Sequence, residues 1–326
     1  MPRSMKLLVT GGAGYIGSIV AQQLLEAGHE VTVLDNLSRG HRAAVPHGAT
    51  LLEIDLLDER ATRDALQQGF DGVLHFAALA LVSESVAHPE RYHRGNHVGA
   101  LNLLDAMRDA GCRRLVFSST CAVYGVPEEV PMHEDISAAP VNAYGNTKLA
   151  IDRMIGDECR AHGLAAASLR YFNVAGARGE LGEDHEPETH LIPLVLRAAA
   201  GVTDHVKVFG TDYPTRDGTA VRDYIHVEDL GVAHALALEA AAPGRHAIYN
   251  LGTGHGYTVR EVIESARRVT GREIEVHEEP RRPGDPPELV AASDRIKREL
   301  GWEPRKDLDE MIADAWAWHQ AHPSGY

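Results

Sequence analysis

Short apolar runs alternate with amphipathic segments along the first half of the chain. The runs at 5–10, 31–34, 73–76, 114–117 and 166–171 have the length of buried strands, and the segments at 18–25, 96–110 and 144–162 repeat their apolar positions with helical spacing. Strands that alternate with helices are typical of a parallel sheet covered by helices on both faces. The pattern therefore predicts an α/β fold built on a doubly wound, Rossmann-type parallel sheet.

The pattern becomes less regular beyond about residue 172, where glycine, proline and charged residues are more frequent. Loops are predicted at 178–188 and 210–218, and helical segments at 190–200, 227–241, 258–270 and 307–319. We expect residues 1–172 to form the sheet domain. Residues 173–326 are expected to form a smaller, mixed α/β domain for the substrate, with one or two segments returning to the sheet.

Length and charge exclude several classes of protein. The chain has 326 residues, enough for one large or two ordinary domains, and a formal net charge of −15. This charge disfavours binding to nucleic acid and to anionic membranes, so an anionic substrate must be held by local arginines. No apolar stretch approaches the roughly 20 residues that span a bilayer, and the N-terminus lacks the pattern of a signal peptide.

The cysteines and histidines give no sign of a disulfide framework or a metal centre. Cys112, Cys121 and Cys159 are odd in number and form no C-x-x-C pair, which favours a reducing, cytoplasmic location. The 19 histidines contain no H-E-x-x-H or comparable spacing, so we expect no metal site.

A glycine-rich turn links the first predicted strand to the first predicted helix. Gly11, Gly14 and Gly17 allow a tight turn, close approach of a pyrophosphate and packing of the helix on the sheet, and the helix N-terminus offers free N–H groups to an anion. The second predicted strand is followed by Asp35, about 20 residues after the loop, where a carboxylate would bind a ribose diol. Asp35 would repel the 2′-phosphate of NADP, so the pattern predicts a site for NAD, while nearby Arg39 would favour NADP.

Small or polar side chains follow several predicted strands at the point where each strand ends. Gly11 and Asp35 follow the first two strands, Ala77 and Ala78 follow the run at 73–76, and the segment 118–120 (SST) follows the run at 114–117. The carboxyl ends of parallel strands meet at one edge of a sheet, and ligands bind beyond that edge. We therefore expect these residues to form one site.

Tyr144 and Lys148 stand four residues apart at the start of a predicted helix. Their Cβ atoms would lie about 5–6 Å apart on one face, a spacing that is also common on solvated helix faces. A lysine ammonium beside a phenol favours the phenolate, so we expect the pKa of Tyr144 to fall. A phenol tuned toward neutral pH can take a proton from a sugar hydroxyl and return it.

Together, the glycine loop, the segment 118–120, Tyr144 and Lys148 resemble the extended short-chain dehydrogenase/reductase family. The resemblance spans essentially the whole chain and extends to the hexose 4-epimerases of that family. It rests on the strings LDNLS (34–38), HFAA (75–78), AVYG (122–125), RYFNVAG (170–176), DYPTRDGT (212–219), VRDYIHV (221–227), YNLGTG (249–254) and RRPGD (281–285). The DYPT and VRDYIHV strings are the most particular to these epimerases.

The resemblance implies an enzyme that holds NAD tightly and uses it as a catalyst, interconverting UDP-glucose and UDP-galactose through transient oxidation at C4 of the sugar. Tyr144 would accept the proton of the 4-hydroxyl group, and Thr120 would hydrogen-bond the 4-oxygen. Lys148 would lower the pKa of Tyr144 and hold the nicotinamide ribose. The 4-keto sugar would then turn to present its other face, so that hydride returns with inverted stereochemistry.

Matching positions imply which residues contact each ligand. For NAD they are Gly11, Gly14, Tyr15, Ile16, Gly17, Asp35, Asn36, Asp55, Leu56, Phe76, Ala77, Ala78, Asn96, Tyr144, Lys148 and Phe172. For the UDP-sugar they are Thr120, Tyr144, Asn173, His190, Leu191, Phe209, Arg222, Arg282, Asp285 and Leu289. Arg222 and Arg282 would clamp the diphosphate, because a planar guanidinium pairs well with phosphate oxygens. Asp285 would bind the uridine ribose, and Phe209 would pack by the uracil.

Several positions depart from the family pattern. Ala80 replaces a lysine found in many relatives, His190 stands where relatives have asparagine, and the family's Asn-Asn-Val string is 95–97 (GNH) here, with Asn96 as the expected contact. Leu289 occupies the position of a bulky tyrosine that closes the sugar pocket in hexose-only relatives. We therefore expect some activity on UDP-N-acetylglucosamine.

Two alternatives stay open. A UDP-xylose/arabinose or UDP-uronate 4-epimerase would use the same scaffold, whereas a dehydratase would need an acid–base pair where Cys121 and Ala122 stand. A catalytically silent NAD-binding regulator usually lacks the Tyr or the Lys that this chain retains. The resemblance also implies a homodimer formed by helices that pack across a two-fold axis.

Overall fold

The computed structural model describes residues 4–282 and 284–326. Its main feature is a seven-stranded sheet with the strand order β10-β6-β5-β4-β1-β2-β3, in which every paired neighbour runs parallel. The strands are β1 (Lys6–Thr10), β2 (Glu30–Asp35), β3 (Thr50–Glu53), β4 (Gly72–His75), β5 (Arg114–Thr120), β6 (Ala165–Tyr171) and β10 (His246–Leu251). The order reverses on either side of β1, which is the doubly wound arrangement. The predicted fold class is confirmed.

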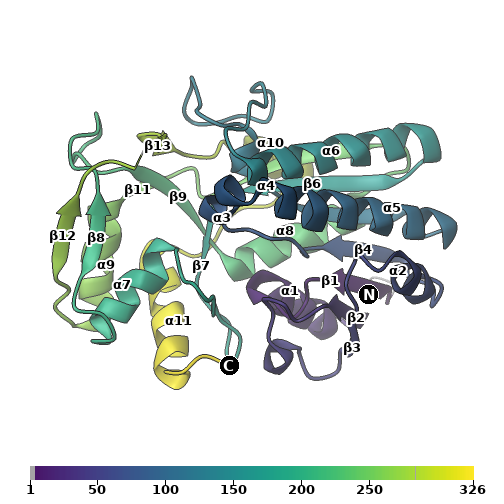
Figure 1. Cartoon of the computed structure of the whole chain (residues 1–326), viewed down its shortest axis with the longest axis horizontal. Coiled ribbons are helices and arrows are strands. Elements are labelled where there is room, and N and C mark those ends of the chain that lie inside the picture. The colour runs from purple at the N-terminus through teal and green to yellow at the C-terminus, as the bar shows by residue number, and fades with distance from the viewer. Residues whose placement is uncertain (1–3, 283) are drawn as a thin grey trace.

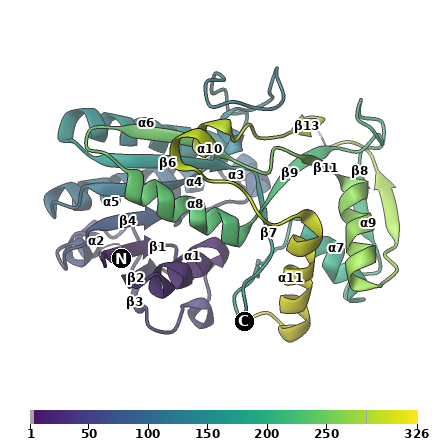
Figure 2. The ribbon, with the colours of Figure 1, turned by 180° about the vertical axis from the view of Figure 1, so that it is seen from behind.

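Helices cover both faces of this sheet (Figures 1 and 2). On one face lie α2 (Glu59–Leu66), α5 (Gly99–Asp109) and α6 (Ala143–His162), around a core that includes Leu8, Leu103 and Phe117. On the other face lie α1 (Tyr15–Glu26), α8 (Val227–Ala240) and α10 (Asp294–Leu300), whose core includes Leu7 and Trp302. Because both faces are buried, the central strands are apolar throughout, as parallel strands usually are.

The helix predicted at 96–110 begins differently from the expectation. The short helices α3 (Val82–Ala87) and α4 (Pro89–Tyr92) lead into a π-helical turn, His93–Val98, and α5 follows without a break. The wider turn places Asn96 inside the protein at 1% exposure, facing α6. Turns of this kind often occur at functional sites.

Two elements from the second half of the chain join the large sheet region: strand β10 within the sheet and helix α8 on its face. Strand β10 pairs in parallel with β6, with Tyr249 opposite Leu169, and α8 buries Leu230 and Ala233 against α1 and the sheet. Residues 227–251 therefore pack with the first half of the chain. The division at residue 172 stays a sequence-based prediction.

The rest of the second half forms a smaller region beside the carboxyl edge of the sheet (Figure 1). Strands β7 (Asn173–Ala175), β9 (Val221–His226), β11 (Gly256–Thr258) and β13 (Glu288–Leu289) form one small sheet, and β8 (Val206–Phe209) pairs with β12 (Val276–Glu279). Helices α7 (Leu191–Ala199), α9 (Val259–Thr270) and α11 (Leu308–Ala321) pack around Val195, Val208 and Met311.

Local sequence explains where these helices start. Thr258 and Glu261 form a capping box at α9, and Asp307 and Glu310 form another at α11, so free N–H groups of both helices are satisfied.

Across the part of the chain that the structure describes, no helix combines the length and apolarity that crossing a membrane requires.

Candidate active site

The predicted site residues of the first half gather at the carboxyl edge of the seven-stranded sheet. Gly11 follows β1, Asp35 ends β2, Phe76 follows β4, Thr120 ends β5 and Phe172 follows β6. These strands are parallel neighbours, so the five positions lie along one edge. The small sheet of β7 and β9 starts at the same edge, directly after Phe172.

The glycine loop packs closely on the chain that follows β4. A Cβ atom on Gly11, which has φ of 71°, would lie 2.5 Å from the backbone nitrogen of Ala77, and one on Gly17 would lie 2.2 Å from the carbonyl oxygen of Gly11. Both distances exclude a side chain. The close approach brings the start of α1 beside Phe76 and Ala77.

The N-terminus of α1 is open to an anion. Gly14 is the N-cap, no side chain caps the helix, and its first turn holds no acidic residue. The N–H groups of the first turn have no acceptor within the helix and favour a negative charge. The Tyr15 hydroxyl donates to the carbonyl oxygen of Gly176 at 2.6 Å, which ties this loop to the end of the RYFNVAG string.

Asp35 and Asn36 lie where an adenosine ribose was predicted to bind. The carboxylate of Asp35 accepts hydrogen bonds from the backbone N–H groups of Ala13 at 3.1 Å and Leu37 at 2.8 Å. Asn36 donates to the carboxylate of Asp55 at 2.9 Å, and Leu56 beside it is buried. Asp35 therefore holds the glycine loop in shape, and each of its oxygens keeps a free lone pair for a diol.

Asn96 holds the segment after Ala78. Its side chain accepts from the N–H of Leu79 at 2.7 Å and donates to the carbonyl oxygen of Leu79 at 3.0 Å and to Thr147 at 3.2 Å. These bonds use the polar atoms of the amide internally. Asn96 thus fixes the backbone that lines the predicted cofactor position, between β4 and α6.

Tyr144 is placed beside Thr120 by the way α6 begins. Asn142 caps α6 by accepting the N–H of Gly145 at 2.8 Å. A Cβ atom on Gly145 would lie 2.6 Å from the carbonyl oxygen of Ala122, so only glycine lets this turn pack on the segment after β5. The Thr120 side chain then hydrogen-bonds the Tyr144 hydroxyl, a contact that by itself favours the phenolate.

Lys148 lies on the same face of α6, buried to 2% exposure. Its amino group donates to the carbonyl oxygen of Ser118 at 2.7 Å and lies 4.8 Å from the centre of the Phe117 ring. The distance from this nitrogen to the centre of the Tyr144 ring is 5.9 Å. The pair therefore shares one face at the end of β5, as the spacing predicted.

The predicted fall in the pKa of Tyr144 is wrong for the chain alone. Burial raises the pKa of Tyr144 to about 12, although the Thr120 hydrogen bond opposes the shift. Burial also lowers the pKa of Lys148 to about 7, while the nearby carboxylate of Asp152 opposes that shift. Desolvation disfavours the charged form of each group, and for Tyr144 in the chain alone it outweighs the influences that favour the phenolate.

The predicted UDP-binding residues lie mainly on the small sheets. Arg222 on β9 forms an ion pair with Asp285 at 2.5 Å and also donates to the carbonyl oxygen of Val221 at 2.7 Å. Leu289 on β13 is the register partner of Arg222, and it packs in an apolar cluster with Phe172. This cluster brings the predicted sugar pocket next to the predicted nicotinamide contact.

Phe209 and Arg282 form a second pair in this region. The Arg282 guanidinium lies 3.9 Å from the centre of the Phe209 ring, a cation–π contact on the protein surface. Asn173 donates to the carbonyl oxygen of Asp223 at 2.9 Å, at the junction of β7 and β9. Both arrangements place polar groups around the predicted nucleotide position.

His190 and Leu191 lie at the start of α7. The Nδ1 atom of His190 lies 2.7 Å from Glu183 and 3.2 Å from Glu188. No hydrogen bond or ion pair between described residues joins His190 to Arg222 or Arg282. The structure thus pairs Arg222 with Asp285 and Phe209 with Arg282, and leaves His190 among acidic residues.

Two functional contacts were missed from the sequence. Asp223 accepts the N–H and hydroxyl of Thr253 at 2.8 Å and the N–H of Ala291 at 3.0 Å, so it joins β9 to two other segments. Tyr171 hydrogen-bonds the hydroxyl of Ser118, directly beside the backbone that holds Lys148. The sequence signal for both contacts was a polar side chain within an otherwise apolar strand, a carboxylate at Asp223 and a phenol at Tyr171.

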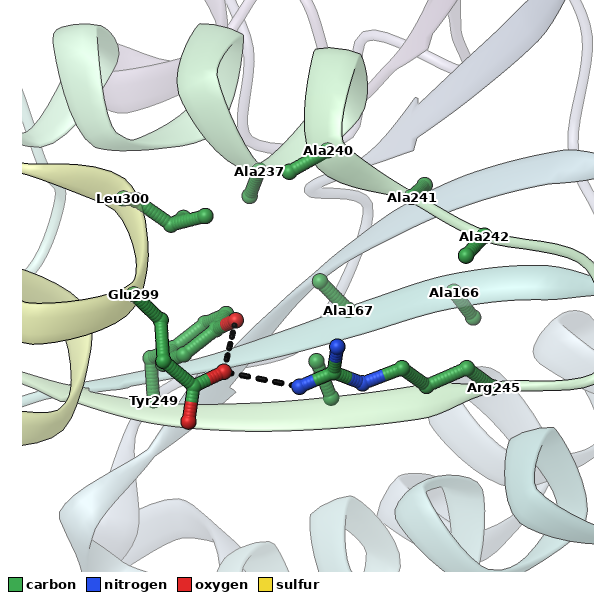
Figure 3. Close-up of a pocket in the computed structure, with 11 residues that line it drawn as sticks. Ala166, Ala167, Ala237, Ala240, Ala241, Ala242, Arg245, Tyr249, Glu299 and Leu300 are labelled. Atoms are coloured by element: carbon green, nitrogen blue, oxygen red, sulfur yellow. Dashed lines mark hydrogen bonds and ion pairs between the residues drawn. The ribbon is translucent and has the colours of Figure 1, made fainter.

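A hollow of about 290 Å³ lies elsewhere, at the edge strand β10 (Figure 3). Alanines of β6 and α8 line it, and Glu299 there accepts from Arg245 at 2.7 Å and Tyr249 at 3.0 Å. It borders the N-terminal half of β6, opposite to the edge that carries Thr120 and Tyr144. None of the residues that line it is a predicted site residue.

The chain resembles known proteins over almost its whole length. Residues 7–252 match the NAD dependent epimerase/dehydratase family. The UDP-glucose 4-epimerase of Corynebacterium glutamicum is 56% identical over 319 residues, which cover 97% of this chain and 96% of that protein. A crystal structure of a UDP-glucose 4-epimerase matches with a TM-score of 0.95 at 45% identity, covering 98% of this chain and 99% of that one.

A further solved structure of similar fold holds NAD+ and UDP. The UDP-glucose 4-epimerase from Bifidobacterium longum in complex with NAD+ and UDP matches with a TM-score of 0.93 at 35% identity, and the match covers 98% of this chain and 100% of that one.

Proposed function

We propose that this chain, which belongs to the NAD dependent epimerase/dehydratase family, interconverts UDP-glucose and UDP-galactose by transient oxidation at C4 of the sugar. One observation carries the proposal: Thr120, Tyr144 and Lys148 meet at the sheet edge that also carries the open N-terminus of α1. A dinucleotide along this edge and a sugar hydroxyl at Tyr144 would be adjacent.

The residues at this edge fit NAD. Gly14 leaves the helix end uncovered for a pyrophosphate, and Asp35 keeps acceptor capacity for a ribose diol while disfavouring a 2′-phosphate. The remaining predicted contacts, Ile16, Ala77 and Ala78, lie beside this path. Bound NAD would supply the hydride acceptor and donor for C4.

Tyr144 takes and returns the proton of the 4-hydroxyl group in this proposal. Thr120 hydrogen-bonds the phenol and is placed to hold the 4-oxygen as well. Lys148 is held by Ser118 and supplies positive charge when protonated, which favours the phenolate. A cationic nicotinamide would add to this effect, so we expect the pKa of Tyr144 to fall only in the complex.

The nucleotide must be gripped firmly while the sugar turns. We assign the diphosphate to Arg222 and Arg282, the uridine ribose to Asp285 and the uracil to Phe209. Arg222 and Asp285 already form a pair, so each is held in place before the ligand arrives. Binding energy from the non-reacting nucleotide can then position a loosely held sugar. Asn173, His190 and Leu191 are assigned to the phosphate or sugar.

The test is an assay of purified protein, without added NAD, against UDP-galactose, UDP-N-acetylgalactosamine and UDP-arabinose. We expect turnover of UDP-galactose, because the family resemblance implies a tightly held NAD that stays bound through purification. A preference for UDP-arabinose would favour the pentose 4-epimerase. Protein that binds NAD but turns over no UDP-sugar, with or without added NAD, would be a regulator and contradict the proposal.

A second activity, on UDP-N-acetylglucosamine, is favoured by Leu289. This side chain is half-buried beside Phe172, at the position where a tyrosine would narrow the sugar pocket. The shorter residue leaves room for a 2-acetamido group. Absence of UDP-N-acetylglucosamine turnover, in enzyme that is active on UDP-galactose, would contradict this second activity.

We also propose a homodimer and a cytoplasmic location. Val98 and Leu101, at the start of α5, are each 43% exposed and supply apolar surface for helix packing across a two-fold axis. Cys112, Cys121 and Cys159 are free thiols, which fits a reducing compartment. Light scattering after size-exclusion chromatography distinguishes a dimer from a 35.4 kDa monomer.

A further inference from the structure

Four potential metal ligands converge in the loop that precedes α7. Glu183, His185, Glu188 and His190 each offer one ligand atom, and the four atoms all lie within 4.8 Å of one another. Their spacing, E-x-H-x-x-E-x-H, places them on one short segment. The proposed reaction gives no role to Glu183, His185 or Glu188. His190 faces the cluster with its Nδ1 atom, so its Nε2 atom is left for the contact with phosphate or sugar assigned above.

The distances between the ligand atoms suit a single small ion. The Nδ1 atom of His190 lies 2.7 Å from a carboxylate oxygen of Glu183 and 3.2 Å from one of Glu188. The Nδ1 atom of His185 lies 3.1 Å and 3.9 Å from the same two carboxylates. Ligand atoms about 2.0–2.1 Å from a tetrahedral zinc ion are roughly 3.3 Å apart, within this range.

Hydrogen bonds between described residues satisfy only part of this cluster: Glu188 accepts from the backbone N–H groups of Thr189 at 2.6 Å and His190 at 2.7 Å. The Nδ1 atom of His185 is buried without a hydrogen-bond partner, although it faces both carboxylates. The side chains of Glu183 and Glu188 are only 7% and 4% exposed. Carboxylates buried this deeply need positive charge nearby. A divalent cation provides that charge and leaves both imidazoles neutral.

We infer that Glu183, His185, Glu188 and His190 bind one divalent transition-metal ion, with zinc as the best fit. Imidazole nitrogen and carboxylate oxygen are both zinc ligands. Four protein ligands fill the tetrahedron, as in zinc sites that stabilise structure. The proposal departs from our sequence-based expectation of no metal site, because that expectation considered only established ligand spacings.

The position of the cluster indicates what the ion would do. His190 is the N-cap of α7, and the ring of His185 packs edge-on against Tyr15 of the glycine loop, with 6.5 Å between ring centres. The loop that carries the four ligands is also held at its start, where Arg178 forms ion pairs with Glu26 and Glu228. A bound ion would therefore fix the loop between the predicted cofactor and substrate positions.

The test measures zinc binding to the protein as purified, with its nucleotide, after a chelator has removed metal. Zinc is titrated in competition with a chromophoric chelator. We expect one equivalent per chain in the wild type. The variants His185→Ala and Glu188→Gln should each weaken binding by at least about 100-fold, because loss of a second-shell partner alone costs 10–100-fold.

His162→Ala serves as the matched control, since it removes an exposed histidine at the end of α6. It should bind zinc like the wild type. Binding that is absent in the wild type, or equal in wild type and both cluster variants, overturns the proposal. If one variant does not fold, as judged by circular dichroism, the other decides. The titration needs no turnover, so its failure is distinguishable from failure of the proposed function.

Discussion

The amino group of Lys148 donates a hydrogen bond to the carbonyl oxygen of Ser118. Its nitrogen lies 5.9 Å from the centre of the ring of Tyr144, the residue that it was expected to activate. In the chain alone Lys148 is buried and Tyr144 is half-buried, and desolvation shifts both pKa values in the direction that favours the neutral form. Activation of the phenol therefore depends on charge that arrives with the ligands. The side chains of the site are in place before the ligands bind, whereas the pKa values needed for proton transfer are not reached in the chain alone.

Replacement of Tyr144 by phenylalanine should abolish epimerisation while NAD is retained. General acid–base catalysis contributes about 10²–10⁴-fold, so we expect kcat to fall by at least that factor. Tyr249→Phe, at the remote hollow, is the control and should keep wild-type activity. Substantial turnover by the Tyr144→Phe variant would remove this residue from the reaction.

The lowered pKa of Lys148 predicts how the free energy of unfolding of the nucleotide-free protein depends on pH. Its pKa is about 7 in the folded chain and ordinarily 10.5, so between pH 7 and 10 the unfolded chain binds a proton that the folded chain does not. The contribution of Lys148 to the free energy of unfolding then rises with pH, by up to about 1.4 kcal/mol per pH unit.

Urea unfolding of wild type and Lys148→Met at pH 7, 8 and 9 isolates this contribution, because the other titrating groups are common to both proteins. The difference, wild type minus variant, should increase with pH. A difference that stays constant or decreases would show that the lysine is not buried in the way described.

The parts of the structure that followed from sequence are those set by local pattern. The strand, glycine loop and helix at residues 5–25 could be predicted because Gly11 and Gly17 act within one turn. The pKa of Tyr144 could not, because a four-residue spacing carries no information about burial. Strand β10 could not be placed either, since its pairing with β6 spans about 80 residues of sequence.

The candidate site shows the same limit. The pairing of Arg222 with Asp285, 63 residues apart, was expected only as two separate ligand contacts, because the resemblance gave roles and not geometry. The four residues of the Glu183 cluster lie on one short segment, but their spacing matches no established metal-ligand motif. Buried polar groups are positioned by packing between distant segments, and that packing is visible only in the fold.

Leu289→Tyr should narrow the range of substrates. The larger ring beside Phe172 would occupy the space that a 2-acetamido group needs. We expect turnover of UDP-N-acetylglucosamine to fall by about 10-fold or more, a typical effect of a pocket clash, with activity on UDP-galactose retained. Equal losses on both substrates would place Leu289 away from the 2-position of the sugar.

Arg222→Lys should weaken binding of all UDP-sugars. A lysine cannot reproduce the planar guanidinium that pairs with Asp285 and that can make a bidentate contact with phosphate. We expect KM to rise by about 10-fold or more, since a charge-assisted hydrogen bond contributes about 1.5–3 kcal/mol. Arg268→Lys, which alters an exposed pair with Asp309, is the control. An unchanged KM would exclude Arg222 from the nucleotide site.

Transient oxidation at C4 is the central claim, and the fate of the hydrogen on that carbon tests it most directly. UDP-galactose that carries deuterium at C4 is incubated with purified protein in ordinary water, and the UDP-glucose formed is examined by NMR. The proposal predicts that deuterium stays on C4, now in the inverted configuration, because the hydride leaves and returns without contact with solvent. Replacement of the deuterium by hydrogen from water would contradict it.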